Sequence, residues 1–474
     1  MSGNQDADLC VIGAGAAGLS VAAIASQVGV RVMLIERDRM GGECLNTGCV
    51  PSKALLAAAK VAHGVSSAAA MGIEASAQVN FKRVHAYVHS AIQAIAPHDS
   101  QERFETLGVE VVRGDARFVD RNTLAVDGRH IRARRFVVAT GSEPFVPSIP
   151  GLEEAGYCTN ENIFDQDARP EHLIVLGGGP IGVEIGQAYR RLGAAVTILE
   201  RDKAMPKDDE ELARPLLQRL RNEGVDIREG ADVRRIERNG DGVEVAVKDG
   251  QHESKIRGTH VLVATGRKPR LASLGLESAG IKYTDKGIVV DRHLQTTVRG
   301  IYAAGDVVDG PHFTHVCSYH AGIIVKNAVF RLSASVDYRS LPWVTYTDPE
   351  LAQVGSTEHQ ARKLHGPSVR VVRVPFAAND RAIAEGHGDG MLKLVASPSG
   401  RVLGASILGA NAGELAHLWV LAIEQKLKLR NIAQMIAPYP TWGELNKAAA
   451  AEFSKPLLSS RATRMAARFL SWLP

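Results

Sequence analysis

The sequence predicts an α/β fold in which two copies of one strand–helix–strand unit precede a C-terminal α+β domain. The copies read DLCVIGAGAAGLSVAAIASQVGVRVMLIERD at residues 8–38 and HLIVLGGGPIGVEIGQAYRRLGAAVTILERD at residues 172–202. Each has an apolar strand, a glycine-rich turn, a helix and a second strand that ends in an acidic residue. The interval from the first glycine to that residue is 23 positions in both copies (36 − 13 and 200 − 177). A later pair of apolar strands, RFVVATG (135–141) and HVLVATG (260–266), repeats the correspondence.

The glycine turn of each copy is spaced to hold the pyrophosphate of a dinucleotide. Its first two glycines let the backbone turn and approach the phosphates at the helix N-terminus, and the acidic residue is placed to accept hydrogen bonds from a ribose. We therefore interpret both copies as Rossmann-like dinucleotide-binding domains rather than as one site and a glycine-rich structural turn. The first site is predicted to use Gly13, Gly15, Gly18, Glu36, Gly42, Thr140 and Gly141. The second is predicted to use Gly177, Gly179, Gly182, Glu200 and Gly266.

The two sites could hold different dinucleotides, a flavin in one and a nicotinamide in the other. Glu200 favours the free 2′-hydroxyl of NADH, because a carboxylate repels a 2′-phosphate. Arg201 and Lys203 lie beside it and could pair with that phosphate, so NADPH stays open as the alternative.

The segment GGECLNTGCVPSK, residues 41–53, places Cys44 and Cys49 five positions apart. In a regular helix the two side chains would be rotated by about 500° and would face different ways, whereas a disulfide needs Cα atoms within about 4.4–6.8 Å. Asn46 and Gly48 are predicted to let the chain double back between them. Zinc would need four ligands, and the other three cysteines are scattered singly, so no metal site is predicted. We interpret the pair as a redox-active disulfide beside the first dinucleotide site.

A disulfide beside two dinucleotides predicts a path for two electrons. Hydride from a nicotinamide would pass through a flavin and leave as a dithiol, with one thiol facing the flavin and the other the substrate. Lys53 follows four residues after Cys49, and its ammonium would stabilise the negative charge on reduced flavin and thiolate. Glu184, in the second glycine helix, is predicted as the partner of Lys53.

The composition fits a globular enzyme and disfavours other classes. The chain has 474 residues, 45% of them hydrophobic and 23% charged, with a net charge of +4, so nucleic-acid binding is not expected. The N-terminus is polar and acidic rather than a signal peptide, and no apolar run approaches the roughly 18 residues of a spanning helix. Five cysteines without an export signal favour a reducing compartment, and we expect a cytoplasmic enzyme.

Taken together, these motifs resemble the class I pyridine nucleotide–disulfide oxidoreductases, the family of dihydrolipoamide dehydrogenase, glutathione reductase and mercuric reductase. The similarity runs over roughly residues 6–454. Further family motifs are matched by ATGRKP (264–269), IYAAGDV (301–307) and PWVTYTDPELAQVG (342–355). The resemblance implies a glutathione reductase-like fold, FAD in the first site, NAD(P)H in the second, and a homodimer formed through a C-terminal dimerisation domain.

The resemblance also implies roles for single residues. Cys44 would be the interchange thiol and Cys49 the charge-transfer thiol against the flavin. The Lys53–Glu184 ion pair would lie near the flavin, and Asp306 would be hydrogen-bonded to its ribityl chain. The segment 314–330 would form a helix whose N-terminus points at the flavin.

One motif departs from the family pattern. Dihydrolipoamide dehydrogenase and glutathione reductase carry His-Pro-Thr-x-x-Glu near the C-terminus, in which the His is the general acid/base. This chain reads APYPTWGELNKAA (437–449), with Tyr439 at the His position and Glu444 retained, and the resemblance implies that both reach Cys44 of the partner subunit. Tyrosine titrates near 10, so Tyr439 is predicted to be a poor base at neutral pH that can donate a hydrogen bond or lie near a metal ion. Mercuric reductases resemble this stretch but carry a C-terminal cysteine pair, and this chain has no cysteine after Cys317.

The predicted organisation has five parts: 1–147 and 270–338 for FAD, 148–269 for NAD(P), 339–454 for dimerisation, and 455–474 as a basic amphipathic tail. On a helix, Leu458, Ala462, Met465, Phe469 and Trp472 would share one face, and three arginines another. We favour a helix docked on the dimer interface or a solvated tail. The alternative is a contact with a protein partner or a weak contact with a membrane surface.

The main functional hypothesis is an FAD-dependent NAD(P)H oxidoreductase that cycles the Cys44–Cys49 disulfide. Its acceptor would be a disulfide or dithiol substrate, in either direction, or a thiophilic metal ion such as Hg(II). One alternative is a membrane-associated NAD(P)H:quinone-type reductase docked by the tail. Another is a subunit that works only with a lipoyl-bearing partner.

Overall fold

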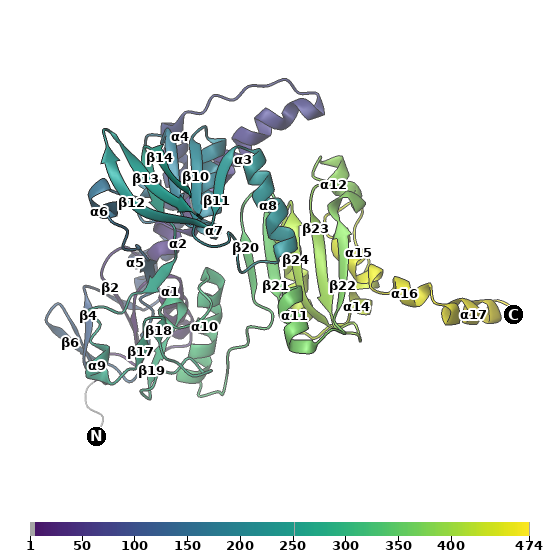
Figure 1. Ribbon diagram of the computed structural model, residues 1–474. Coiled ribbons are helices and arrows are strands. Elements are labelled where there is room, and N and C mark those ends of the chain that lie inside the picture. Colours follow the sequence, from purple (N-terminus) through teal and green to yellow (C-terminus); the bar gives the residue numbers. More distant parts are fainter. Residues whose placement is uncertain (1–4, 251, 474) are drawn as a thin grey trace. The chain divides into compact units, whose positions relative to one another are not determined.

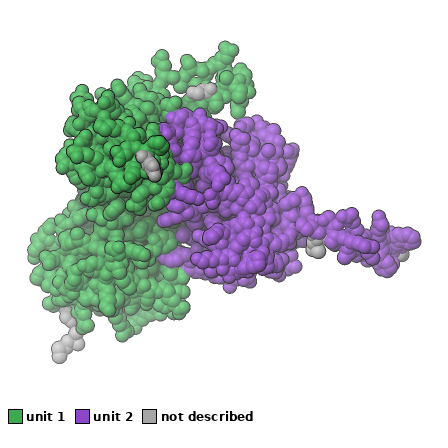
Figure 2. Space-filling view, viewed as in Figure 1, with its two compact units in different colours: residues 1–202, 228–336 green, residues 203–227, 337–474 purple. Residues whose placement is uncertain are grey.

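The structure of the chain is a computed structural model that describes residues 5–250 and 252–473. It contains two compact units, Met1–Asp202 with Arg228–Val336 and Lys203–Ile227 with Asp337–Pro474 (Figure 2). The first unit holds both glycine-rich repeats. The finer boundaries at residues 147, 269, 338 and 454 stay predictions.

The first repeat builds a five-stranded parallel sheet in the order β19-β7-β1-β2-β3. Figure 1 labels two of these strands, β2 and β19. Its strands are β1 (Leu9–Ile12), β2 (Val32–Glu36), β3 (Glu110–Arg113), β7 (Phe136–Val138) and β19 (Ile301–Ala303). Successive side chains of a strand point to opposite faces, so the sheet joins two cores. Val11 and Leu34 pack with helices α1 (Ala16–Gln27) and α10 (Thr314–Ala328). Ile12 and Met33 pack on the other side with the small sheet of β4 (Ala116–Asp120), β5 (Thr123–Val126) and β6 (Arg129–Arg132).

The second repeat builds a four-stranded sheet in the order β11-β10-β9-β15. The elements are β9 (His172–Leu176), α7 (Pro180–Arg191), β10 (Ala195–Glu200), β11 (Val225–Glu229) and β15 (His260–Val263). Ile174 and Val263 share a core with Val245 and Val247 from the antiparallel sheet of β12 (Ala231–Asn239), β13 (Gly242–Asp249) and β14 (His252–Gly258). The repeat in the sequence is therefore a repeat of parallel βαβ units.

Two interrupted helical stretches, residues 49–71 and 81–106, follow Cys44 in the chain. The first is α3 (Cys49–Ser67) followed by η1 (Ala68–Met71). The second is divided into α4 (Phe81–Ile95), η2 (Ala96–Asp99) and α5 (Gln101–Thr106). The helix expected at 314–330 is α10, which ends at Ala328.

The second unit is built on an antiparallel five-stranded sheet in the order β20-β21-β24-β23-β22. Its strands are β20 (Pro342–Thr345), β21 (Glu350–Gly355), β22 (Arg370–Pro375), β23 (Met391–Ala396) and β24 (Val402–Gly409). Its core is shared with α13 (Ala412–Glu424), α14 (Leu429–Ala433) and α15 (Glu444–Glu452). Trp419 is fully buried there, and its Nε1 donates to Asn446 Oδ1 at 2.7 Å, which ties α13 to α15. The expected C-terminal α+β architecture is confirmed.

The tail forms the short helix α16 (Lys455–Leu458) and the helix α17 (Arg461–Leu470). Ser460 caps α17 by accepting a hydrogen bond from Thr463 N at 3.1 Å. Across the described part of the chain, no helix combines the length and apolarity that crossing a bilayer requires.

A buried lysine organises the charges of the second unit. Lys393 on β23 has a side chain only 5% exposed, and its Nζ lies 2.9 Å from Asp209 Oδ2, 2.8 Å from Glu211 Oε2 and 2.9 Å from Glu358 Oε2. Burial alone would lower the pKa of Lys393, but these hydrogen bonds outweigh it and raise that pKa. Asp209 and Glu211 begin α8 (Glu210–Asn222), and Glu358 begins α11 (Glu358–His365), so one ammonium joins two helices to the sheet.

Replacing that ammonium should destabilise the second unit. Lys393→Met would leave the buried Asp209 carboxylate without its cation, and we expect a loss of about 3 kcal/mol. Glu211 and Glu358 would keep their ion pairs with Arg373. Arg214→Ala, which breaks the exposed pair with Glu210, is the control and should cost less than about 1 kcal/mol. All four tryptophans, Trp343, Trp419, Trp442 and Trp472, lie in this unit, so denaturant unfolding followed by tryptophan fluorescence reports on it. Equal midpoints for the two variants would contradict the central role of Lys393.

Candidate redox-active site

The first glycine turn is in direct contact with the segment that carries the cysteines. Gly41 N donates to Ala14 O at 3.0 Å, and a Cβ added at Gly42 would lie 2.7 Å from the Cα of Gly15. Gly42 has φ +57°, a conformation that side chains with a Cβ rarely adopt. It begins helix α2 (Gly42–Asn46), so the close approach places the cysteine segment beside the first dinucleotide turn.

The two glycine turns are built by the same contacts. A Cβ on Gly13 would lie 2.5 Å from Ala139 O, and a Cβ on Gly177 would lie 2.4 Å from Ala264 O. Gly13 has φ +102° and Gly177 φ +109°. Both turns therefore exclude a side chain and expose backbone at a helix N-terminus, which is the cradle a pyrophosphate requires.

The acidic residue at the end of each second strand lies at its own glycine turn. Glu36 Oε2 accepts from Ala14 N at 2.6 Å, and Glu200 Oε2 accepts from Gly178 N at 2.7 Å. Each carboxylate is thus fixed next to the turn, where a ribose of a bound dinucleotide would meet it. The residues present fit two dinucleotides, and the geometry of the repeat matches its sequence.

The remaining residues predicted for dinucleotide binding follow the strands of the same sheets. Gly141 has φ +70° after β7, and Gly266 has φ +136° after β15. Thr140 Oγ1 donates to Arg270 O at 2.9 Å. Asp306 lies in η4 (Gly305–Val307), where its Oδ2 accepts from Ser142 Oγ at 2.9 Å.

The chain between the cysteines turns differently from the prediction. Asn46 is the last residue of α2 rather than a point of reversal, and its Nδ2 donates to Met40 O at 3.0 Å and to Gly42 O at 2.7 Å. The break falls at Thr47 and Gly48, and α3 begins at Cys49. A Cβ on Gly48 would come 3.0 Å from Glu43 O, so this turn is tight. The side chain of Asn46 stabilises α2, and Thr47 and Gly48 reverse the chain.

The turn brings the two thiols within hydrogen-bonding distance of each other. Their mutual hydrogen bond raises the pKa of Cys44 and lowers that of Cys49 to about 6, because Cys44 donates to the Cys49 sulfur. Thr314 Oγ1, at the start of α10, lies 3.2 Å from Cys49 Sγ and lowers that pKa further. Cys49 is also the first residue of the 19-residue helix α3, and a helix N-terminus favours a thiolate. Both cysteines are present as thiols; Cys44 is half-buried and Cys49 exposed.

Lys53 and Glu184, singled out in the sequence, are brought together. Lys53 Nζ lies 2.9 Å from Glu184 Oε2, and the Glu184 side chain is 7% exposed. Lys53 is one turn after Cys49 on α3, and its charge lowers the pKa of the Cys49 thiol. Cys44, Cys49, Lys53 and Glu184 therefore form one cluster in the first unit.

A charged pair beside the cysteines was missed in the sequence. Glu43 precedes Cys44, and burial raises the pKa of its carboxyl to about 7, opposed by the neighbouring Arg267. The Arg267 guanidinium donates to Glu43, and its Nε donates to Ser142 Oγ at 2.8 Å. Ser142 in turn bonds to Asp306. Both charged residues stand inside quoted motifs, but nothing in their spacing shows that they pair.

Tyr439 has a different partner from the one the motif suggests. In the second unit its hydroxyl donates to Asp380 Oδ2 at 2.9 Å, which raises the pKa of Tyr439. Glu444 Oε2 instead accepts from Thr441 N at 3.2 Å. Asp380 begins α12 (Asp380–Ala384), 59 positions before Tyr439, and no motif marks it. Tyr439 therefore stays protonated at neutral pH, as predicted from its residue type.

Two dinucleotide cradles, one with a reactive dithiol beside it, define a flavoprotein disulfide reductase. Residues 7–321 match the family model described as pyridine nucleotide-disulphide oxidoreductase, and residues 341–450 match that family's dimerisation domain. The chain belongs to the pyridine nucleotide-disulphide oxidoreductase family. It is an NAD(P)H-dependent enzyme of this class, with FAD and a nicotinamide dinucleotide as cofactors and a dimerisation domain that supports a homodimer.

Relatives of two kinds resemble the whole chain. A mercuric reductase from Bacillus cereus is 36% identical over 457 residues, which is 96% of this chain and 72% of that protein. A dihydrolipoyl dehydrogenase from Thermus scotoductus is 35% identical over 449 residues, covering 92% and 95%.

Solved structures of flavoprotein disulfide reductases also resemble this chain along most of its length. The HOCl-induced flavoprotein disulfide reductase RclA from Escherichia coli, in its Cu(II) complex, gives a TM-score of 0.84 at 30% identity and covers 94% of this chain and 99% of its own. LpdA from Mycobacterium tuberculosis gives 0.86 at 27% identity with the same coverage. The predicted family and fold are confirmed.

The hydrogen bond from Thr314 should be measurable in the reactivity of Cys49. In the reduced holoenzyme, we expect iodoacetamide to alkylate Cys49 with a pH midpoint near 6, as its lowered pKa requires. Thr314→Val removes a donor to the thiolate and should raise that midpoint by about one unit. Thr314→Ser keeps the hydroxyl and is the matched control. The same midpoint in wild type and Thr314→Val would contradict the assigned hydrogen bond.

Proposed function

We propose that the chain passes two electrons from NADH through FAD to the Cys44–Cys49 pair and delivers them to a thiophilic metal ion or a disulfide. The observation that carries this proposal is the asymmetry of the two thiols. Cys49 is poised as a thiolate by Cys44, Thr314 and Lys53, whereas Cys44 stays protonated. Two electrons and two protons convert the disulfide to the dithiol, and transfer to the acceptor restores the disulfide.

Each thiol has its own task in this proposal. Cys49 begins α3 beside the glycine turn and is assigned to face the flavin, which supplies two-electron chemistry when bound. Cys44 is assigned to bind or attack the acceptor, and to do so it must give up its proton and react as the thiolate. The Lys53–Glu184 pair holds an ammonium at the start of α3, where it stabilises negative charge on the Cys49 sulfur.

The partner of Tyr439 favours a metal ion over a disulfide as the acceptor. Exchange between the dithiol and a substrate disulfide needs a general acid/base with a pKa near neutrality to move the thiol protons, and the hydrogen bond to Asp380 raises the pKa of Tyr439 instead. Reduction of a thiolate-bound metal ion makes no such demand. Mercuric reductases among the relatives, and the structural neighbour described as a Cu(II) complex, support this choice.

The second glycine turn favours NADH over NADPH. The Glu200 carboxylate accepts from two backbone amides, Gly178 N at 2.7 Å and Asp202 N at 3.0 Å, and so presents a fixed negative charge. Arg201, which could have paired with a 2′-phosphate, lies 3.6 Å from an Asp202 carboxylate oxygen.

Steady-state NADH oxidation with Hg(II) and with lipoamide tests the proposed acceptor. We expect Hg(II)-dependent turnover on the order of 1 to 10³ per second and much slower turnover with lipoamide. Cys44→Ser should lower Hg(II) turnover at least about a hundredfold while NADH still bleaches the flavin. Tyr439→His should restore a general acid/base and raise lipoamide turnover by about tenfold or more. Fast lipoamide turnover by the wild type would show a disulfide acceptor, and Cys44→Ser with full Hg(II) activity would refute the assigned thiol.

The tail provides the one observation in favour of a membrane-associated reductase. The apolar side chains of α17 and the residues after it are exposed, among them Met465 at 61%, Phe469 at 71% and Trp472 at 89%. The three arginines of α17 lie within about 60° of one another on a helical wheel, and no acidic residue follows Glu452. An apolar face beside a cationic face suits an anionic lipid surface.

Vesicle binding tests this second candidate. Full-length protein should co-sediment with vesicles containing phosphatidylglycerol, and less so with phosphatidylcholine alone or at high salt. A chain truncated after Ser454 should stay in the supernatant with its NADH oxidation intact. Equal pelleting of the two chains would reject lipid docking, and loss of dimerisation on truncation would assign the tail to the dimer.

A further inference from the structure

A pocket of about 450 Å³ in the first unit lies away from the cysteines. Arg135 directly precedes β7, and Arg299 and Gly300 directly precede β19. The glycine turn and Asp306 follow the carboxyl ends of the parallel strands, so the pocket occupies the opposite edge of the same sheet. Helix α10 likewise begins at Thr314 and ends just before Arg331 of the pocket. The occupant of this pocket is therefore distinct from the redox substrate.

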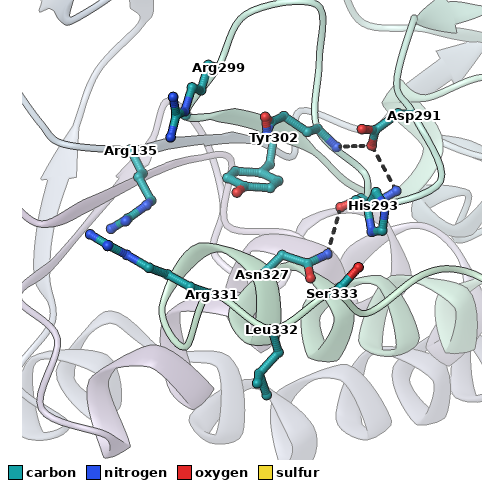
Figure 3. Close-up of a pocket in the computed structure, with 11 residues that line it drawn as sticks. Arg135, Asp291, His293, Arg299, Tyr302, Asn327, Arg331, Leu332 and Ser333 are labelled. Carbon is teal, nitrogen blue, oxygen red and sulfur yellow. Dashed lines mark hydrogen bonds between the residues drawn. The ribbon is translucent and has the colours of Figure 1, made fainter.

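The pocket gathers positive charge. Arg135, Arg299 and Arg331 line it, against a single carboxylate, Asp291. Figure 3 shows Arg135 and Arg331 extending to the same side of the Tyr302 ring with their guanidinium groups facing each other, and Arg299 above them. Within residues 5–250 and 252–473, none of the three guanidinium groups forms an ion pair with a carboxylate. Like charges that converge without a counterion repel one another, and an anion bound between them replaces that repulsion with attraction.

The carboxylate of Asp291 forms hydrogen bonds with the backbone of its own loop. Its Oδ1 accepts from His293 N at 2.8 Å and from Gln295 N at 3.0 Å, which fixes the loop before β19. Asn327 Nδ2 donates to His293 O at 3.1 Å and holds the loop against α10. The wall of the pocket is thus a hydrogen-bonded frame, and its arginines are left to face a ligand.

We propose that this pocket binds a small molecule carrying a phosphate or polyphosphate group. The planar, always-charged guanidinium binds phosphate oxygens through paired N–H donors, and three of them suit a polyanion better than a single carboxylate. The volume lies within the range of about 300–1,000 Å³ found for small-molecule sites, larger than one phosphate needs. Tyr302, buried to 7% exposure, supplies an aromatic wall.

Calorimetric titration of the FAD-loaded enzyme with pyrophosphate, ATP and citrate tests the proposal. Pyrophosphate and ATP should bind, and Arg135→Gln or Arg331→Gln should weaken each by at least about tenfold. Arg134→Gln is the matched control, since it removes the same charge from the neighbouring residue, whose Nε lies 3.4 Å from Asp8 Oδ1. All three variants should keep the wild-type KM for NADH and rate of NADH oxidation.

Several results would overturn the proposal. If pyrophosphate binds with a Kd above about 1 mM, the proposed site does not exist. Equal pyrophosphate affinities of the Arg135→Gln and Arg134→Gln variants would show that Arg135 of the pocket does not bind the anion. ATP binding that NADH displaces belongs to the nicotinamide site, and tighter binding of citrate than of pyrophosphate refutes the phosphate class.

Discussion

The close approach of two backbone segments at Gly15 and Gly42 is the constraint on which the redox cluster depends. A Cβ at Gly42 would meet the Cα of Gly15 at 2.7 Å, so the cysteine segment can carry no side chain at Gly42 while it stays against the glycine turn. This contact fixes α2 against the turn after β1. The tight turn at Thr47 and Gly48 then sets Cys49 at the start of α3, within reach of Thr314 from a distant part of the chain. The close packing of Gly15 and Gly42 thus sets the position of Cys44 and Cys49.

Electrostatics then separates the roles of two identical side chains. Cys49 receives a hydrogen bond from each of two neighbours, lies at a helix N-terminus, and is near the ammonium of Lys53. Cys44 donates to Cys49 and keeps its proton. In the second unit a hydrogen bond has the opposite effect on Tyr439. Its hydroxyl donates to the Asp380 carboxylate, and this raises the pKa of Tyr439. The chain combines an activated thiolate with a motif residue that is no base at neutral pH.

The sequence was sufficient where function depends on repeated local patterns. The two glycine turns and their acidic residues follow from spacing and from the repeat, and the pairing of Lys53 with Glu184 follows from the family resemblance. Pairings without a pattern could not be predicted: Glu43 and Arg267 are 224 positions apart, and Thr314 is 265 from Cys49. Asn46 was misread for a physical reason. Asparagine tolerates left-handed turns, but its amide can equally bond backbone carbonyls inside a helix, as it does in α2.

The central claim is that Cys44 and Cys49 exchange two electrons with the nicotinamide, and one mass measurement tests it directly. Cleavage after Arg39 and Lys53 releases residues 40–53, which contain both cysteines and no other. In the oxidised holoenzyme, this peptide should resist alkylation and be lighter by two hydrogen atoms than the dithiol. After anaerobic addition of NADH, it should carry two alkyl groups. Two alkyl groups before NADH is added, or a disulfide that NADH leaves intact, would contradict the account.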